Sequence, residues 1–254
     1  MIHITGYQGQ LGNDAQKFLK KKEVNFIAKS KKQLDISKPI NTLNFKEFSK
    51  IKIIINLAAF TGVDNAETLK KKCYSVNVTG VNNLVHLSNK INATLIHIST
   101  DYVFNGKSNR SYKESDQTDP INYYGYSKML AENVIKKKCK KFYIVRTSWV
   151  FSNNKKNIIN FIKQSLKNKE KKLIYDQYGN PTSTISLSEM LHYLIIFSLK
   201  KSIKHYGIYH FCNYPQTNWF EFGKYFIRDV LKLNDVKLIK IKGQDLNLIA
   251  KRPK

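Results

Sequence analysis

Two side chains on one predicted helix could carry acid–base chemistry. Tyr124 and Lys128 stand four positions apart in the string Tyr-Gly-Tyr-Ser-Lys, which places them on the same helix face. A phenol has an ordinary pKa of about 10, and a neighbouring ammonium favours the phenolate, which brings the hydroxyl toward useful acid–base strength. The same ammonium could hold the ribose of a cofactor. Because this spacing is common by chance, it gains weight only from the residues that accompany it.

A hydroxyl group precedes that helix in the chain. Ser99, Thr100 and Asp101 end an apolar run, 94–99, that predicts a buried strand. Open α/β sheets bind ligands at the carboxyl ends of their strands, so a hydroxyl at this position could hydrogen-bond a reacting carbonyl. A strand-end hydroxyl followed by a Tyr/Lys pair is a more specific pattern than either part alone.

A glycine turn stands at the start of the chain. Gly6, Gly9 and Gly12 follow a short apolar strand, 2–5, and open a predicted helix. Glycines at such a turn let the backbone approach a pyrophosphate, which then rests on the positive end of the helix. The spacing is G-x-x-G-x-x-G and differs from the G-x-G-x-x-G of ordinary dehydrogenases. The position between strand and helix predicts a dinucleotide site.

The end of the second predicted strand, 24–28, bears on which dinucleotide is used. An acid at this point would accept the 2′-hydroxyl of NAD and repel a 2′-phosphate. The segment 28–32 holds Ser30 and three lysines but no acid. It therefore favours NADPH as the cofactor, and leaves NADH open.

Alternating strands and helices predict an α/β fold, a Rossmann-like doubly wound parallel sheet with a small C-terminal substrate-binding lobe. We expect an NAD(P)-binding domain over 1–150 and the lobe over 151–254, with part of the chain returning to the core. The predicted strands are 2–5, 24–28, 52–59, 94–99, 142–150, 172–175, 208–211 and 236–241. The predicted helices are 14–21, 76–87, 127–136, 158–166, 187–199 and 219–231.

Composition narrows the class of protein. No stretch reaches the roughly 20 apolar residues that a membrane span needs, and the first residues begin directly as a strand with no signal peptide. Cys73, Cys139 and Cys212 are odd in number and widely spaced, which indicates a reducing cytoplasm. We expect a cytoplasmic protein without membrane association.

The formal net charge of +26 needs its own explanation. One interpretation is a nucleic-acid surface, because basic stripes neutralise phosphates. Almost all of the charge is lysine, however, in runs such as 20–22, 70–72 and 136–138, whereas grooves that grip phosphates and bases favour the planar fork of arginine. We therefore expect solvated surface lysines, no nucleic-acid partner, and mild steering of an anionic substrate.

Longer strings point to one family. They are Asn-Leu-Ala-Ala-Phe-Thr-Gly-Val-Asp-Asn-Ala-Glu at 56–67, Ser-Thr-Asp-Tyr-Val-Phe-Asn-Gly at 99–106, Arg-Thr-Ser-Trp-Val-Phe at 146–151 and Asp-Gln-Tyr-Gly-Asn-Pro-Thr at 176–182. With them the chain resembles the extended short-chain dehydrogenases and, over nearly its whole length, the dTDP-4-dehydrorhamnose reductases among them. The resemblance implies hydride transfer from NAD(P)H to the C4 ketone of dTDP-4-dehydro-L-rhamnose, which forms dTDP-L-rhamnose for cell-surface polysaccharides such as O-antigen.

The resemblance also implies roles for individual residues. The catalytic residues would be Thr100, Tyr124 and Lys128. Together with the glycine turn and the end of the second strand, the residues that bind the cofactor would be Gly6, Gly9, Gln10, Leu11, Gly12, Ser30, Asp35, Ile36, Ala58, Ala59, Phe60, Thr61, Asn77, Tyr124 and Lys128. The sugar nucleotide would meet Thr100, Asp101, Val103 and Trp149. Asn77 would support the lysine through water.

Several polar and aromatic residues have plainer interpretations. The six histidines stand singly in strands and helices and predict structural roles, with no metal site. Glu67 and Glu132 fit surface or capping positions better than metal ligation. Trp149 could pack in the core, although its place just past a strand end favours contact with a ligand.

Related chemistries set the alternatives. Similar 4,6-dehydratases carry an acid pair after the strand-end threonine, whereas Asp101 here is followed by Tyr102, so the sequence favours simple reduction. A second family that the chain resembles is the non-catalytic, NADP-binding regulatory subunit of methionine adenosyltransferase. The reductase pattern continues beyond an Arg-Pro like Arg252-Pro253, so we expect a less complete substrate side here. The sequence is compatible with a homodimer, and with Mg²⁺ taking part in its assembly, but decides neither.

Overall fold

A computed structural model describes residues 1–40, 48–152, 159, 162, 170–200 and 205–253. In this part of the chain the strands are β1 (Ile2–Thr5), β2 (Phe26–Ala28), β3 (Ile53–Asn56), β4 (Thr94–Thr100), β5 (Phe142–Thr147), β6 (Val150–Phe151), β7 (Glu170–Ile174), β8 (Tyr178–Gly179), β9 (Thr182–Ser183), β10 (Gly207–His210), β11 (Thr217–Asn218) and β12 (Lys237–Ile241). The helices are α1 (Gln10–Lys21), α3 (Val63–Thr68), α4 (Lys70–Tyr74), α5 (Gly80–Lys90), α6 (Tyr123–Lys138), α8 (Thr184–Leu199) and α9 (Trp219–Tyr225). Two π-helical turns, Ser75–Thr79 and Phe226–Val230, follow α4 and α9.

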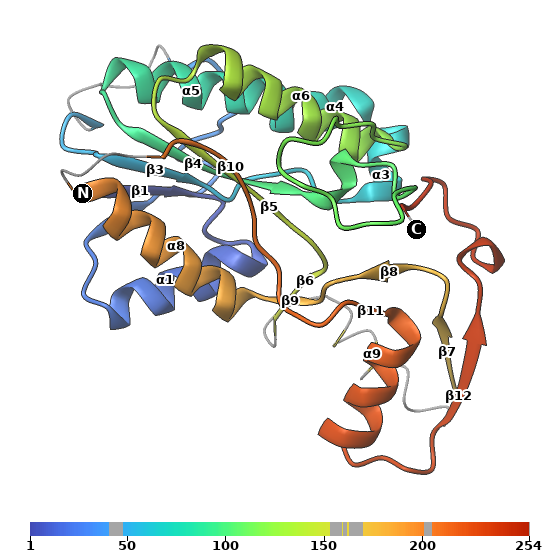
Figure 1. Cartoon of the computed structure of the whole chain (residues 1–254). Helices are drawn as coiled ribbons and strands as arrows, with labels where there is room; N and C mark the ends of the chain where they lie inside the picture. The colour runs from blue at the N-terminus through green and yellow to red at the C-terminus, as the bar shows by residue number, and fades with distance from the viewer. Residues whose placement is uncertain (41–47, 153–158, 160–161, 163–169, 201–204, 254) are drawn as a thin grey trace.

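Six parallel strands form the central sheet in the order β2-β1-β3-β4-β5-β10. The chain moves from β1 outward to β2 and then returns to the other side of β1 as β3, so the strand order reverses between β1 and β3. Helices α1 and α8 cover one face of the sheet, and α4, α5 and α6 cover the other (Figure 1). The predicted doubly wound parallel sheet is confirmed, and its reversal point is where such folds hold ligands.

Burial on both faces explains the apolar runs of the sequence. All four residues of β3 are buried, and two separate apolar clusters lie above and below the sheet. The strand predicted over 52–59 stops at Asn56, because the polypeptide there leaves the ladder and turns along the sheet edge. Likewise the strand predicted over 142–150 is divided into β5 and β6.

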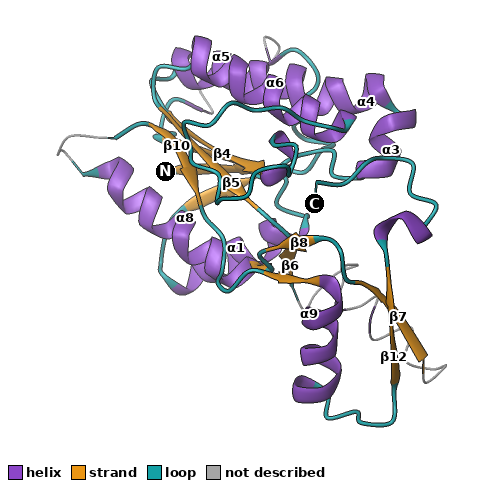
Figure 2. Ribbon diagram, turned by 45° about the vertical axis from the view of Figure 1, so that its right-hand side comes forward, coloured by secondary structure: helices purple, strands orange, loops and turns teal. Residues whose placement is uncertain are grey.

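The later part of the chain builds a small lobe beside the sheet edge. Strands β7 and β12 pair in parallel, and α9 packs on them around Leu173, Phe220 and Ile227 (Figure 2). The helix predicted over 219–231 is thus one α-helix continued by a π-helical turn. The helix predicted over 158–166 lies, apart from residues 159 and 162, outside the described residues.

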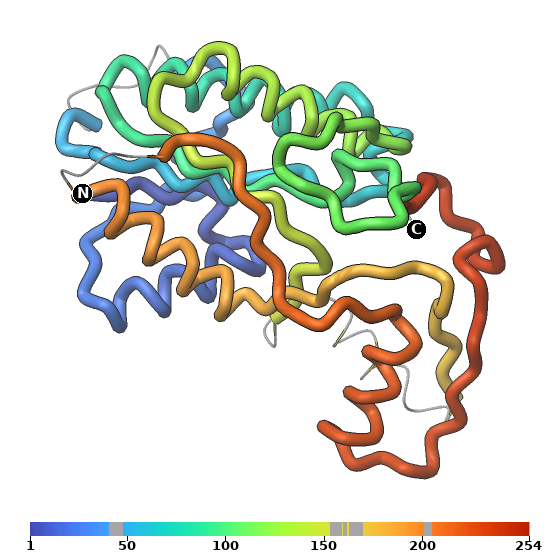
Figure 3. Tube along the Cα trace, viewed as in Figure 1, coloured from blue at the N-terminus to red at the C-terminus, as the bar shows by residue number. Residues whose placement is uncertain are grey.

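After β12 the chain runs back to the larger domain (Figure 3). There Asp64 accepts a hydrogen bond from the amide of Ala250 at 2.9 Å and pairs with Arg252 at 2.6 Å. Asn122, which caps α6, also donates to the carbonyl of Lys251 at 2.9 Å. The final residues therefore rest beside the start of the helix that carries Tyr124.

The surface agrees with the interpretation of the charge as solvated. The lysine runs 20–22, 70–72 and 136–138 are all exposed. Within the described ranges, no helix combines the length and the apolar character that crossing a bilayer requires.

One buried ion pair ties the sheet to α6. Glu132 is fully buried, binds Arg146 of β5 at 2.7 Å and accepts a hydrogen bond from the hydroxyl of Ser99 on β4. The expectation that Glu132 is a surface or capping residue is therefore wrong. Glu67 does act as a cap, since its carboxylate accepts the amide of Tyr123 at 2.7 Å.

Replacing Glu132 tests this pair. Glu132→Ala leaves the Arg146 guanidinium buried without its counter-ion, and we expect the free energy of unfolding to fall by about 3 to 5 kcal/mol in urea denaturation. Glu170→Ala is the control, because its partner Lys237 lies 3.8 Å away on the exposed surface, and it should cost less than about 1 kcal/mol. Equal losses in the two variants would contradict the structural role of the buried pair.

Candidate active site

The glycine turn closes tightly against the loop after β3. Gly6 has a φ of +67°, and a Cβ on it would lie 2.4 Å from the amide nitrogen of Ala58. A Cβ on Gly12 would come equally close to the carbonyl of Gly6. Gly9 precedes α1 without a side-chain cap and is exposed. Gly9 supplies no side-chain cap to the start of α1, which fits the binding of a pyrophosphate at this helix end.

The loop after β3 is held by Asn77. Its side-chain amide accepts a hydrogen bond from the backbone N–H of Phe60 at 2.8 Å and donates to the carbonyl of the same residue at 3.1 Å. It also donates to the hydroxyl of Ser127 at 2.9 Å. Asn77 thus positions the loop of Ala58, Ala59, Phe60 and Thr61, and its support of Lys128 through water stays a prediction.

The segment after β2 forms a polar turn. The amide and hydroxyl of Ser30 both donate to the side-chain carbonyl of Gln33 at 2.9 Å. Although burial raises the pKa of Asp35, hydrogen bonds from Ser37 outweigh it and lower that pKa overall. Asp35 borders a hollow of about 450 Å³ that is also lined by Lys31 and Lys32. This hollow brings ammonium groups to the region expected for the adenine ribose.

Ile36 does not offer its side chain to a ligand. It is 5% exposed, and a Cβ on Gly80 would lie 2.8 Å from its Cγ1. The side chain is therefore a core contact between the loop and α5. The expectation that Ile36 lies at the cofactor can therefore concern only its backbone.

Thr100 ends β4 at the same sheet edge. Its hydroxyl donates to the carboxylate of Asp101 at 3.0 Å and accepts the amide of Tyr102 at 3.2 Å, which caps a short 3₁₀ turn. Val103 in this turn is fully buried, so its side chain is a packing group and not the expected substrate contact. Burial raises the pKa of Asp101 to about 6.

Tyr124 is the second residue of α6 and lies beside this turn. Its ring meets that of Tyr102 edge-on, with 5.8 Å between centroids, and Gly125 brings the helix against the Tyr102 carbonyl, leaving no space for a Cβ. Burial raises the pKa of Tyr124, and a side-chain hydrogen bond with Thr100 opposes this effect only in part. The expected lowering of the phenol pKa by Lys128 is therefore not found in the protein without its ligands. The phenol is held protonated.

Lys128 lies one turn further along α6 and is 2% exposed. Its ammonium nitrogen is 2.7 Å from the carbonyl oxygen of Ile98, to which it donates, and 3.1 Å from Nε2 of His97. Burial lowers the pKa of Lys128 to about 8. His97 was expected to be merely structural; a histidine three residues before the strand-end threonine, on the same strand, is the signal that could have singled it out.

Trp149 stands at the junction of the sheet and the small lobe. It has a positive φ of 44°, and its indole stacks on Trp219 with 3.5 Å between ring centroids. Gly179 also lies close to the indole, since a Cβ on this glycine would be 2.4 Å from its Cε2 atom. Trp149 is thus packed between two elements of the lobe while part of it stays accessible. Trp219 was not singled out from the sequence, because its partner is distant along the chain.

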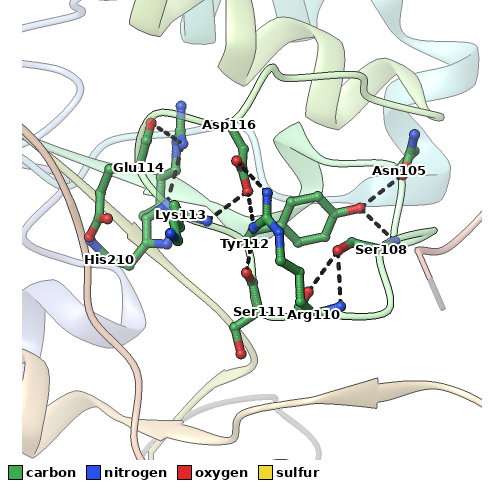
Figure 4. A network of polar contacts seen from close by, with 10 residues as sticks. Asn105, Ser108, Arg110, Ser111, Tyr112, Lys113, Glu114, Asp116 and His210 are labelled. Atoms are coloured by element: carbon green, nitrogen blue, oxygen red, sulfur yellow. Dashed lines mark hydrogen bonds and ion pairs between the residues drawn. The ribbon is translucent and has the colours of Figure 1, made fainter.

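A polar network holds the loop that connects Thr100 to α6 (Figure 4). Arg110 and Asp116 form a two-pronged ion pair at 2.8 and 2.9 Å. Tyr112 donates to Asn105 at 2.9 Å, and Glu114 accepts the amide of His210 on β10. These contacts fix the loop against the sheet edge.

No metal-binding cluster of three or more His, Cys, Asp or Glu side chains occurs in the ranges that the structure describes. The chemistry at this sheet edge is that of a hydroxyl, a phenol, an amine and a carboxyl group.

Comparisons with known proteins agree with this geometry. The family described as "RmlD substrate binding domain" matches residues 1–254. A spore coat polysaccharide biosynthesis protein of Bacillus subtilis is 36% identical over 87% of this chain and 76% of its own length. A dTDP-4-dehydrorhamnose reductase of Aggregatibacter actinomycetemcomitans is 33% identical over 98% of this chain and 87% of its own. The crystal structure of such a reductase from Bacillus anthracis, in complex with NADP, has a TM-score of 0.91 at 35% identity and covers 99% and 87% of the two chains.

The raised pKa of Asp101 predicts how its replacement changes stability. Ionised Asp101 disfavours the folded state, a cost that is full above its folded pKa and shrinks as the pH falls from about 6 toward 4. Asp101→Asn keeps an acceptor for Thr100 and removes this cost. We expect the free energy of unfolding to rise by about 2 to 3 kcal/mol at pH 8 and by about half as much at pH 5.

Urea unfolding at the two pH values measures this difference. Asp116→Asn is the control: Arg110 lowers its carboxyl pKa, and both pH values lie above the ordinary pKa of an aspartate, so its replacement should destabilise the protein equally at pH 8 and pH 5. A stabilisation by Asp101→Asn that is independent of pH would contradict the assignment.

Proposed function

The chain belongs to the dTDP-4-dehydrorhamnose reductase family of NAD(P)-dependent oxidoreductases, and we propose that it reduces the C4 ketone of dTDP-4-dehydro-L-rhamnose to form dTDP-L-rhamnose. The observation that supports the proposal is the side-chain hydrogen bond between Thr100, at the end of β4, and Tyr124 on α6, the helix that also carries Lys128 one turn further along. The reductases among the relatives support this function over that of a regulatory subunit of methionine adenosyltransferase.

Each side chain has a distinct task in this proposal. A bound NAD(P)H supplies the hydride. Tyr124 gives its proton to the C4 oxygen, and burial keeps the phenol protonated until then. Thr100 would donate a hydrogen bond from its hydroxyl to the same oxygen. Lys128, one turn further along α6, would stabilise the phenolate that Tyr124 becomes when it loses its proton.

We propose NADPH as the preferred form of the cofactor. Lys31 and Lys32, which follow Ser30 in the turn after β2, line a hollow and bring two ammonium groups to it. These groups suit a 2′-phosphate, and the segment 28–32 carries no acid that would accept a free 2′-hydroxyl.

In this proposal the two parts of the chain bind different ligands. Residues 1–150 would bind the dinucleotide, and residues 151–254 would take up the sugar nucleotide against Asp101 and Trp149. The stacking of Trp149 on Trp219 supports this division, because it holds one proposed substrate contact between the sheet edge and the lobe.

Tyr124→Phe tests the assignment of the acid. Without the hydroxyl, we expect kcat for dTDP-4-dehydro-L-rhamnose to fall by a factor of about 10² to 10⁴, as for loss of a general acid. NADPH binding should be unchanged. Both are measured by nicotinamide absorbance and by titration of cofactor fluorescence.

Tyr126→Phe is the matched control on the same helix, since Tyr126 is 43% exposed and should tolerate the change with near-normal kcat. Near-normal turnover by Tyr124→Phe would refute the role of the phenol. If the unmodified protein binds NADPH but never oxidises it with this sugar, the proposed reaction itself fails.

The choice of cofactor is tested by Ser30→Asp. A carboxylate at this position would accept the 2′-hydroxyl of NADH and repel the 2′-phosphate of NADPH. We expect the ratio of kcat/KM for NADPH to that for NADH to fall by about tenfold or more, about 1.4 kcal/mol. A ratio that stays unchanged would place the 2′-phosphate elsewhere.

A further inference from the structure

A line of buried polar groups leads from the loop after β3 to Lys128. Asn56 Nδ2 lies 2.9 Å from Nδ1 of His97, whose Nε2 lies 3.1 Å from Nζ of Lys128. The exposed fractions of the three side chains are 1%, 1% and 2%. Every contact along this line joins one nitrogen to another, so the positions of the hydrogens decide which charge states are compatible with it.

The orientation of Asn56 is fixed at its far end. The backbone N–H of Ala58 points at Oδ1 of Asn56 at 3.2 Å, and the hydroxyl of Thr5 lies 2.6 Å from the same atom. A backbone N–H can only donate, so this atom must be the oxygen and not the nitrogen of the amide. The NH₂ group of Asn56 therefore faces His97 and donates to Nδ1, which has to carry a lone pair.

His97 is then left with its proton on Nε2. Burial is the largest cause that lowers the pKa of His97 well below its ordinary value, so the ring is neutral and has one N–H. That N–H faces Nζ of Lys128, and only the neutral amine has a lone pair to accept it. A hydrogen on Nζ remains for the carbonyl of Ile98 at 2.7 Å.

The surroundings of Lys128 agree with an uncharged amine. Glu132, on the same helix, is the carboxylate that favours the ammonium, but it is shared with Arg146 of β5 and Ser99 of β4. Cys73 on α4 would also favour the ammonium if it were ionised, but burial raises its pKa, which keeps it a neutral thiol. Burial outweighs both and lowers the pKa of Lys128.

We propose that Asn56 and His97 act as positioning residues that set the charge of the catalytic lysine: with Asn56 donating to Nδ1, His97 favours the neutral amine of Lys128 over the ammonium. Whether Lys128 faces Tyr124 as an amine or as an ammonium then depends on the tautomer of a histidine that touches neither substrate nor cofactor. The catalytic importance of the Lys128 charge rests on the proposed function, in which Lys128 stabilises the phenolate of Tyr124. The hydrogen-bond pattern itself does not.

The first test observes the pattern directly. In ¹⁵N-labelled protein without cofactor at pH 8.5, long-range ¹H–¹⁵N correlation spectra should show His97 as the neutral Nε2–H tautomer. The ¹³Cε shift of Lys128 should titrate about two units below that of the exposed lysines. A protonated Nδ1, a charged ring or a Lys128 that titrates with the surface lysines would overturn the proposal.

Asn56→Asp reverses the pattern. One carboxylate oxygen can still accept the N–H of Ala58, but the other must accept from Nδ1 of His97, which moves the ring proton and leaves Nε2 to accept from an ammonium. We expect the titration of Lys128 to move up by at least one pH unit, with the corresponding limb of the kcat/KM profile moving in step.

Asn56→Ala separates the tautomer from the added charge. It introduces no carboxylate but frees Nδ1, so the titration of Lys128 should also move up, by less. If only the aspartate variant shifts it, the effect is simple electrostatics and the proposal is wrong. Because the spectra need no turnover, an enzyme inactive on the proposed sugar that still shows the Nε2–H tautomer would refute the proposed function and leave this inference standing.

Discussion

The buried ion pair between Glu132 and Arg146 is the constraint on which the site depends. Glu132 follows Lys128 by one helical turn, and Ser99, which donates to it, precedes Thr100 directly. The pair therefore fixes α6 against β4 and β5 at the height where the phenol, the amine and the strand-end hydroxyl must meet. An apolar contact could join the same elements, but it would not define their register along the helix axis as a charged, directional pair does.

Much of the fold follows from the sequence, because its signals are local. The run of isoleucines at 53–55 can form only a strand covered on both faces, and the glycine turn after β1 requires a backbone that approaches Ala58 within the reach of a Cβ. Parallel strands then bring Thr100 and the Gly6 turn to one edge without further information. The exact ends of the strands could not be foreseen, since a strand stops where its neighbour leaves the ladder.

The residues that the sequence concealed depend on partners distant along the chain. In the sequence, Glu132 cannot be told from an exposed helical acid, because its partner Arg146 lies on β5. Val103 and Ile36 could equally line a pocket, and only their burial in the structure shows that they are core residues. The place of His97 three residues before Thr100 is a weak signal by itself, and only the packing of α6 on the sheet brings the Lys128 amine to its ring. Burial and pairing of this kind are properties of the assembled layers.

The central claim is that hydride passes from the nicotinamide to C4 of the sugar while Tyr124 supplies the proton. The most direct measurement uses NADPH stereospecifically deuterated at C4 of the nicotinamide ring, in each of its two forms, with dTDP-4-dehydro-L-rhamnose as the acceptor. Proton NMR of the product should show dTDP-L-rhamnose with one deuterium at the sugar C4 from one of the two forms and none from the other. Product without deuterium at C4 from either form, or cofactor that is bound but never oxidised, would contradict the account.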